Sequence, residues 1–147
     1  LINFRKKCKK NGIEFYVSND TKLLTKLKAD GLYISAYNKN LLLNIYSKKG
    51  FKIIGSAHNQ REIDLKIKQG CEAIIYSRLF RTKYPNKKGH LGMQKFNIIS
   101  LRSRKEIIPL GGINEKNLCK MKSVMSSSFA CLSAIKKKPA KIINRLF

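Results

Sequence analysis

Short apolar runs alternate along this chain with more polar segments in which leucine or isoleucine recurs every three or four positions. Within each run the apolar residues are continuous, which is typical of parallel strands buried on both faces. Six runs are predicted to be strands: residues 13–17, 31–35, 51–56, 73–77, 107–110 and 129–132. Their starts recur about every 20 residues, close to the shortest length of a strand followed by a helix.

The polar segments between the runs have the spacing of helices with one apolar face. Leu23, Leu24 and Leu27 share one face, and Ile63 and Ile67 share another. The predicted helices cover residues 4–10, 21–28, 61–68, 93–101, 114–121 and 136–147. Three glycines stand between a helix and the next strand, where a C′ residue belongs: Gly12, Gly50 and Gly70. The pattern therefore predicts strands that alternate with helices.

These strand–helix units predict the fold class. Six units do not close a barrel, but two more ahead of Leu1 would complete the eight of a TIM barrel. We therefore predict an α/β protein with a (β/α)8 TIM-barrel fold, in which residues 1–147 form a single domain. The alternative is an open, doubly wound sheet. Because a helix is already under way at the first residues, we expect this chain to be a C-terminal portion that lacks the first two strands.

The composition is strongly basic, with 32 Lys and Arg against 8 Asp and Glu and a formal charge of +24. Such a charge is typical of proteins that bind nucleic acid or a membrane surface. However, the chain has 25 Lys, 18 Ile and 12 Asn but 7 Arg, and the first three are residues with A/T-rich codons. Selection for phosphate contacts would favour Arg as much as Lys. Because the charges are also spread along the chain, we expect neither nucleic acid nor a membrane as partner.

The four cysteines, at positions 8, 71, 119 and 131, lie far apart and form no C-x-x-C pair. With only two histidines in the chain, this spacing argues against a structural zinc site. Free cysteines in or beside apolar runs behave as small core residues, which suits a reducing compartment. The sequence has no signal peptide at its start and no apolar run of 18 residues, so we expect a cytoplasmic protein.

Two apolar runs near the end of the chain lead into helical segments through small residues. Gly111 and Gly112 follow the run 107–110, and Ser133 follows the run 129–132. Glycine lets main-chain N–H groups approach a phosphate, and the start of the next helix adds positive potential. These three residues are therefore candidate phosphate ligands at the last two strands. The alternative is that the glycines only turn a strand into a helix and that Ser133 is an ordinary N-cap.

Ser56 and His58 stand at the end of the third run, where the active sites of barrel enzymes lie. An imidazole can transfer protons near neutral pH, so both are candidate catalytic residues. The alternative for His58 is a loop histidine with no task. The connection 78–92 is long and basic and contains Pro85, and long loops in compact α/β domains are often lids over a site.

Six segments resemble, in order and spacing, thiamine phosphate synthase and its TenI-type relatives. They are FYVSND at 15–20, LKADGLYI at 27–34, GSAH at 55–58, FRT at 80–82, LGGI at 110–113 and LSAI at 132–135. The resemblance covers essentially the whole chain and implies a role in thiamine biosynthesis. The implied reaction joins hydroxymethylpyrimidine pyrophosphate to thiazole phosphate: pyrophosphate leaves, a pyrimidine cation forms, and the thiazole nitrogen captures it. The partners would be phosphorylated small molecules, whose charge the protein must stabilise.

The resemblance also implies roles for individual residues. Ser56 would face the substrate pyrophosphate, and His58 lies at or near the histidine that carries protons in TenI-type thiazole aromatases. The family's Thr-x-Thr-Lys pattern is not kept, because Pro85 stands where its lysine would be. The residues that correspond to the pyrophosphate-binding loop in place and charge are Thr82, Arg81, Lys83 and Lys87.

The resemblance implies Mg2+ as the cofactor, held in the family by two acidic residues that follow the first two strands seen here. Aligned without gaps, these positions fall on Asn19 and Asn38, and Asp20 is one residue late. Asparagine offers a carbonyl oxygen but no charge, which weakens a magnesium site. Asn19, Asp20 and Asn38 are the candidate metal ligands if the family site survives.

Three functions are compatible with these residues. The first is a divergent synthase in which Arg78 and Arg81, at positions that the family usually gives to proline, replace part of the metal's charge on pyrophosphate. The second is a TenI-like thiazole phosphate aromatase that uses His58, or a non-catalytic thiazole phosphate binder. The third, of another class, is a basic nucleic-acid-binding protein, of which a steep salt dependence would be required. Nothing in the sequence indicates an oligomeric state.

Overall fold

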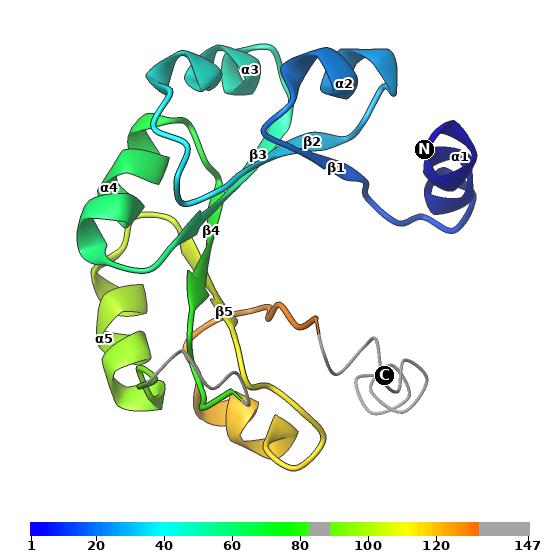
Figure 1. Ribbon diagram of the computed structural model, residues 1–147. Helices are drawn as coiled ribbons and strands as arrows, with labels where there is room; N and C mark the ends of the chain where they lie inside the picture. Colours follow the sequence, from blue (N-terminus) through cyan, green and yellow to red (C-terminus); the bar gives the residue numbers. More distant parts are fainter. Residues whose placement is uncertain (83–88, 133–147) are drawn as a thin grey trace. The chain divides into compact units, whose positions relative to one another are not determined.

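The computed structural model describes residues 1–82 and 89–132, and the chain divides into two compact units, Leu1–Ile74 and Ile75–Phe147 (Figure 1). The first unit holds α1 (Ile2–Lys10), β1 (Tyr16–Ser18), α2 (Thr21–Lys26), β2 (Gly31–Ile34), η1 (Leu41–Leu43), α3 (Asn44–Lys48), β3 (Lys52–Ala57) and α4 (Gln60–Lys68). The strand β4 (Ala73–Ser77) crosses the boundary, and the second unit continues with α5 (Met93–Arg102), β5 (Glu106–Leu110) and η2 (Leu118–Ser123). Strands β1, β3 and β4 are each followed by a predicted helix, β2 is followed by η1 and α3, and β5 is followed by the 3-10 helix η2.

The five strands belong to one sheet, in which the order β1-β2-β3-β4-β5 follows the chain. Strands β1 and β2 pair in parallel with Val17 opposite Leu32, and β2 and β3 pair in parallel with Leu32 opposite Ile53. Leu32 and Ile53 are fully buried. Parallel strands that are neighbours both in the chain and in the sheet are the arrangement of a (β/α) barrel, in agreement with the predicted fold class.

The helices of the first unit begin where a side chain caps them. The Asp20 carboxylate accepts a hydrogen bond from the main-chain N–H of Leu23 (2.9 Å), and Asn59 accepts one from Glu62 in the same way (2.9 Å). Helix α4 ends at Lys68, and Gly70, two residues later, has a φ of +82°, the conformation predicted for a C′ glycine. Helices α2, α3 and α4 pack on strands β1 to β3 and bury their apolar residues there (Figure 1).

The sixth predicted strand, 129–132, contributes one parallel bridge between Ala130 and Leu110 and no extended ladder. The main-chain N–H of Ala130 donates to the carbonyl of Pro109 (2.9 Å). In a parallel strand, the N–H and the C=O of one residue bond to the same neighbouring strand. An N–H at position 109 would therefore also have bonded to the segment before Ala130, but proline has no N–H. The carbonyl of Ser128 accepts from the Ser126 hydroxyl instead (2.9 Å). Proline in β5 therefore explains why this prediction was wrong in extent.

The predicted helix 114–121 was also wrong, because the residues after β5 form a turn and then the short 3-10 helix η2. The side chains of Asn114 and Asn117 both donate to the carbonyl of Gly112 (2.8 Å each). The Asn114 side chain also accepts from the main-chain N–H of Lys116 (2.9 Å). Asparagine side chains that bond the nearby backbone in this way compete with the first turn of an α-helix.

The second unit has its own apolar interior among the described residues. Phe96 of α5 and Leu79 are fully buried, and Ile107 of β5 is nearly so. Helix α5 packs on β5, which places Phe96 against the sheet. Over residues 1–82 and 89–132, no helix is both long enough and apolar enough to cross a membrane.

Candidate functional site

Polar side chains meet at the carboxyl ends of β1 and β2. The Asn19 carboxamide oxygen accepts from the main-chain N–H of Ser35 and from the Asn38 carboxamide (3.1 Å each). Its nitrogen donates to the hydroxyls of Ser18 (3.3 Å) and Ser35 (3.1 Å). The φ of Asn19 is +55°, a left-handed conformation that asparagine tolerates better than most residues. The two residues at which the resemblance places the family's acids are therefore in direct contact, as two neutral amides.

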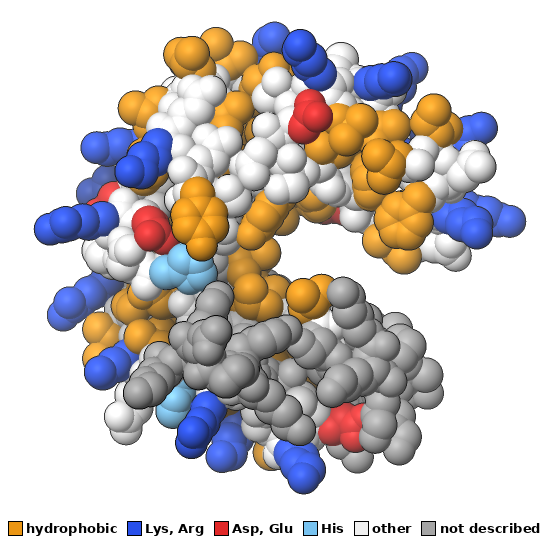
Figure 2. Space-filling view, in the orientation of Figure 1, with side chains coloured by type: hydrophobic (Ala, Val, Ile, Leu, Met, Phe, Trp, Pro, Cys, Tyr) orange, Lys and Arg blue, Asp and Glu red, His pale blue; other side chains and the backbone are white. Residues whose placement is uncertain are grey.

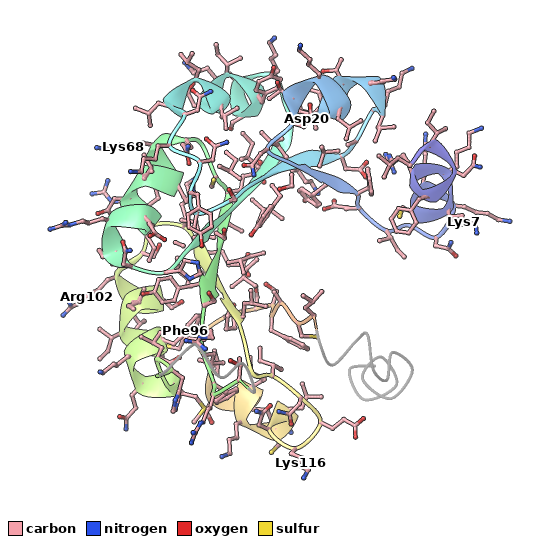
Figure 3. The ribbon with its side chains drawn as sticks, viewed as in Figure 1. Lys7, Asp20, Lys68, Phe96, Arg102 and Lys116 are labelled. Atoms are coloured by element: carbon pink, nitrogen blue, oxygen red, sulfur yellow. The ribbon has the colours of Figure 1, made fainter. Side chains whose placement is uncertain are left out.

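These donors do not fit a magnesium ion held by carboxylates. Both lone pairs of the Asn19 carboxamide oxygen already accept hydrogen bonds. The Asn38 oxygen accepts from the N–H of Asn40 (2.9 Å), and the Asp20 carboxylate caps α2 (Figure 3). In the part of the chain that the structure describes, no three residues among His, Cys, Asp and Glu are grouped as metal ligands would be. Mg2+ binds through carboxylates and water, and of the side chains of Asn19, Asn38 and Asp20 only that of Asp20 has a carboxylate, which already caps α2.

Ser56 and His58 lie at the carboxyl end of β3. Ser56 is a buried residue of the strand itself, and His58 is exposed in the turn that precedes α4. The main-chain N–H of His58 donates to the Glu62 carboxylate (2.7 Å), which also accepts from the Asn59 side chain (2.8 Å). This reciprocal capping fixes the backbone of His58 at the start of α4.

Two buried polar side chains that the sequence analysis missed, Lys66 and Gln69, contact the loop after β2. Lys66 of α4 and Gln69, which follows the last residue of this helix, are both fully buried. The Lys66 ammonium donates to the main-chain carbonyl of Asn38 and to the Gln69 carboxamide (2.8 Å each). Gln69 donates in turn to the carbonyls of Asn38 and Asn40 (3.0 Å each). Burial lowers the pKa of Lys66, because it disfavours the charged form.

A signal for this group is present in the sequence. Position 66 lies three residues after Ile63, on the apolar face of the helix. The sequence predicts Ile63 and Ile67 as the apolar face of this helix. In the structure Ile67 is only half-buried, whereas Lys66 is fully buried. A lysine on the apolar stripe of a helix is thus the feature that could have revealed a buried cation.

The second unit gathers its candidate residues between the end of β4 and the end of β5. The Arg78 guanidinium donates to the Thr82 hydroxyl (3.0 Å). The segment that carries both is bound to the β5 end by main-chain hydrogen bonds, from Leu79 to the Leu110 carbonyl (2.9 Å) and from Phe80 to the Gly111 carbonyl (3.0 Å). Arg81 is exposed on the same segment. A cation and a hydroxyl are therefore held next to the Gly-Gly turn.

The two glycines of this turn permit the close approach. A Cβ added at Gly112 would lie 2.6 Å from the carbonyl oxygen of Arg81 and 2.7 Å from that of Phe80. A Cβ at Gly111 would lie 3.0 Å from Cγ of Arg78. Both glycines have positive φ, +107° at Gly111 and +71° at Gly112. The turn thus needs glycine both because a Cβ would clash and because φ is positive.

Of the other candidate residues, Lys83, Lys87 and Ser133 lie outside the described residues.

The basic side chains follow the pattern expected from the sequence. Figure 2 shows Lys and Arg side chains scattered over the visible face instead of gathered into one patch. Nucleic-acid-binding surfaces usually concentrate their charge on one face or along one helix.

Parallel strand–helix units with polar groups at the carboxyl ends of their strands define a protein of the (β/α) barrel class. The sequence matches the model of the thiamine monophosphate synthase family over residues 1–135, so the chain belongs to that family. This confirms the family that the sequence resembles.

Individual relatives agree with this membership. The chain is 29% identical over 135 residues to a thiamine-phosphate synthase from Prochlorococcus marinus subsp. pastoris, covering 91% of this chain and 38% of that protein. It is 26% identical over 149 residues to a thiamine-phosphate synthase from Pelagibacter ubique, covering 97% of this chain and 71% of that protein. The chain thus spans well under half the length of the Prochlorococcus relative.

A solved structure agrees with the fold. A thiamine phosphate pyrophosphorylase from Pyrococcus furiosus superposes with a TM-score of 0.75 over 99% of this chain and 75% of that chain, at 15% identity. This likeness confirms the fold class, because the two chains share their fold although few of their residues are identical.

Proposed function

We propose that this chain supplies the phosphate-handling part of a thiamine phosphate synthase. The reaction joins hydroxymethylpyrimidine pyrophosphate to thiazole phosphate and releases pyrophosphate. The observation that carries the proposal is membership of the family over residues 1–135. The partners are then phosphorylated small molecules in the cytoplasm.

Within the second unit, the residues near the Gly-Gly turn are suited to anions. When the bond between the pyrimidine methylene carbon and pyrophosphate breaks, its electron pair leaves with pyrophosphate, and negative charge grows on that group. The Arg78 guanidinium, oriented by its hydrogen bond to Thr82 (3.0 Å), would stabilise this charge together with Arg81. The main chain at Gly111 and Gly112 would hold the phosphate of the thiazole, because glycine leaves the N–H groups accessible.

Within the first unit, Ser56 and the paired amides of Asn19 and Asn38 would supply uncharged hydrogen-bonding groups at the carboxyl ends of the strands. The amides orient one another through the 3.1 Å hydrogen bond between them. Asp20 would act only as the cap of α2.

A second candidate function is favoured by the same pair of amides. If both carboxylates have been lost with the transferase chemistry, the chain would act as a thiazole phosphate aromatase or binder. His58, exposed and held at its backbone by Glu62, would then be the proton carrier.

The test is formation of thiamine phosphate by the full-length protein that contains this sequence, from the two substrates. The assay is run with Mg2+ and again with excess chelator. Product in both conditions supports a synthase in which arginine charge replaces the metal, and product only with Mg2+ contradicts that replacement. Thiazole phosphate binding without product in either condition supports the second function instead.

A further inference from the structure

The loop between β2 and η1, residues 35–40, is bound by side chains at the C-terminal end of α4. The carbonyl of Asn38 accepts two hydrogen bonds, from the Lys66 ammonium (2.8 Å) and the Gln69 carboxamide (3.0 Å). The carbonyl of Asn40 accepts a third, from Gln69 (3.0 Å). At the tip of this loop Tyr37 is 87% exposed, so it adds no packing to the core. Two side chains at the C-terminal end of α4 therefore bind the main chain of this loop at two carbonyls.

Burying a lysine at this place is costly and is not compensated by an ion pair. The ion pairs of Arg5 with Asp30 and of Lys52 with Glu14 do not include Lys66. Replacing a buried charged group by an apolar one of similar volume is often neutral for stability. A role in fixing the loop accounts for the lysine better than a contribution to stability does.

The neighbouring strand leaves room for this lysine. A Cβ at Gly55 of β3 would lie 2.8 Å from Cδ of Lys66 and 2.9 Å from its Cγ. A larger residue at position 55 would displace the lysine stem and with it the ammonium group. Gly55 and Lys66 are therefore matched to one another across β3 and α4.

The hydrogen bonds continue from the loop to the candidate site. The Asn38 carboxamide donates to Asn19 (3.1 Å), and the Asn19 carboxamide donates to Ser35 in the same loop (3.1 Å). A shift of the Asn38 backbone would thus move both amides at the carboxyl ends of β1 and β2.

We propose that Lys66 and Gln69 are positioning residues, which hold the 35–40 loop so that Asn38 and Asn19 face the substrate in the arrangement that the reaction needs. The proposal rests on the proposed synthase function for its kinetic consequence. Misplacement of substrate-positioning groups by about 1 Å can lower a rate roughly 100-fold.

The experiment compares three variants of the full-length protein. Lys66→Met removes the ammonium but fills its space. Gln69→Glu keeps an acceptor for Lys66 but removes both donors to the loop. Lys68→Met is the control, because Lys68 is exposed on the same helix and points away from the sheet (Figure 3).

The proposal predicts that Lys66→Met and Gln69→Glu each lower kcat roughly 10- to 100-fold, while the melting temperature of Lys66→Met stays near or above that of the wild type. The control keeps wild-type kcat. In an Asn38→Ala background the Lys66→Met change has little further effect, because both act through the same loop. Wild-type kcat in Lys66→Met and Gln69→Glu, or losses that multiply fully with Asn38→Ala, would overturn the proposal.

Amide hydrogen exchange separates this proposal from the synthase function. Faster exchange at Asn40 and Leu42 in Lys66→Met, with unchanged exchange in β3, supports the positioning role whether or not the wild type forms product. Unchanged exchange at both amides overturns it. Absence of product from the wild type, in contrast, contradicts the proposed function alone.

Discussion

The two units hold the ends of their strands by different means. In the first unit, side-chain amides and a buried lysine bind the loop after β2. In the second unit, main-chain hydrogen bonds and two glycines bring the segment after β4 against the end of β5. The side-chain network of the first unit depends on which residues carry the polar groups. The main-chain network of the second unit depends on glycine, because a Cβ at Gly111 or Gly112 would block the close approach. Substitutions in the first unit should therefore alter the site, and glycine substitutions in the second should alter the fold.

The units also differ in charge at these ends. The amides of Asn19 and Asn38 are neutral, and the segment after β4 carries Arg78 and Arg81. Residues of the first unit are therefore expected to fix the geometry of the strand ends, and those of the second unit to stabilise negative charge.

The largest effect is expected from Gly112→Ala. Its Cβ would meet two carbonyl oxygens within 2.7 Å at a φ of +71°. Left-handed strain and the clash together should lower the free energy of unfolding by about 2–4 kcal/mol, measured by urea denaturation. Gly89→Ala is the matched control, because φ is +83° there but nothing lies within 4 Å of the new Cβ. Equal losses in the two variants would mean that the close approach contributes nothing.

The next effect concerns electrostatics in the second unit. Arg78→Met should lower kcat roughly 100-fold, the usual size for loss of one donor to a developing anion. Its melting temperature should change little, since Arg78 is only half-buried. The control is Arg102→Met at the exposed end of α5 (Figure 3). A loss of equal size in the control would assign the effect to net charge instead of to a specific contact.

A smaller effect is expected at Asn19. Asn19→Ala removes the carboxamide that bonds Ser35 and Asn38 and leaves alanine at a φ of +55°. The expected loss of unfolding free energy is about 2 kcal/mol by urea denaturation. Asn19→Gly loses the same hydrogen bonds without the strain, so its loss should be smaller. A larger loss in the glycine variant would contradict the account of strain.

The smallest effect is at an exposed pair of the first unit. Hydrogen bonds from Lys52 and then Tyr16 hold the pKa of Glu14 below its ordinary value. Because the folded pKa lies below the unfolded one, this stability is present above the unfolded pKa and is lost as pH falls through the folded pKa. The melting-temperature difference between wild type and Glu14→Gln should therefore shrink as the solution is acidified. A melting-temperature difference that stays constant from neutral to acidic pH would argue against the interaction of Glu14 with Lys52. The effect is small because both side chains are exposed.

Much of the fold was predictable because its signals are local. Five of the six apolar runs are strands, and Gly12, Gly50 and Gly70 have the positive φ expected of glycines that follow helices. The errors have local causes too. Pro109 interrupts the ladder to the sixth run, and Asn114 and Asn117 bond the backbone of Gly112 in place of a helix.

The candidate site was predictable to a smaller extent. The structure brings Asn19 into contact with Asn38, and Arg78 into contact with Thr82. The roles of these residues as ligands stay predictions. The contact of Lys66 with the loop was not anticipated, because a lysine in a helical segment is usually solvated.

The sequence by itself determined the positions of five strands, most of the helices and the family, because these depend on residues close together in the chain. Only the tertiary structure decided that Lys66 bonds a carbonyl 28 residues away and that Gly112 must admit the carbonyl of Arg81. Such contacts form when elements pack, since packing removes water and leaves each buried polar group to find a partner among its new neighbours.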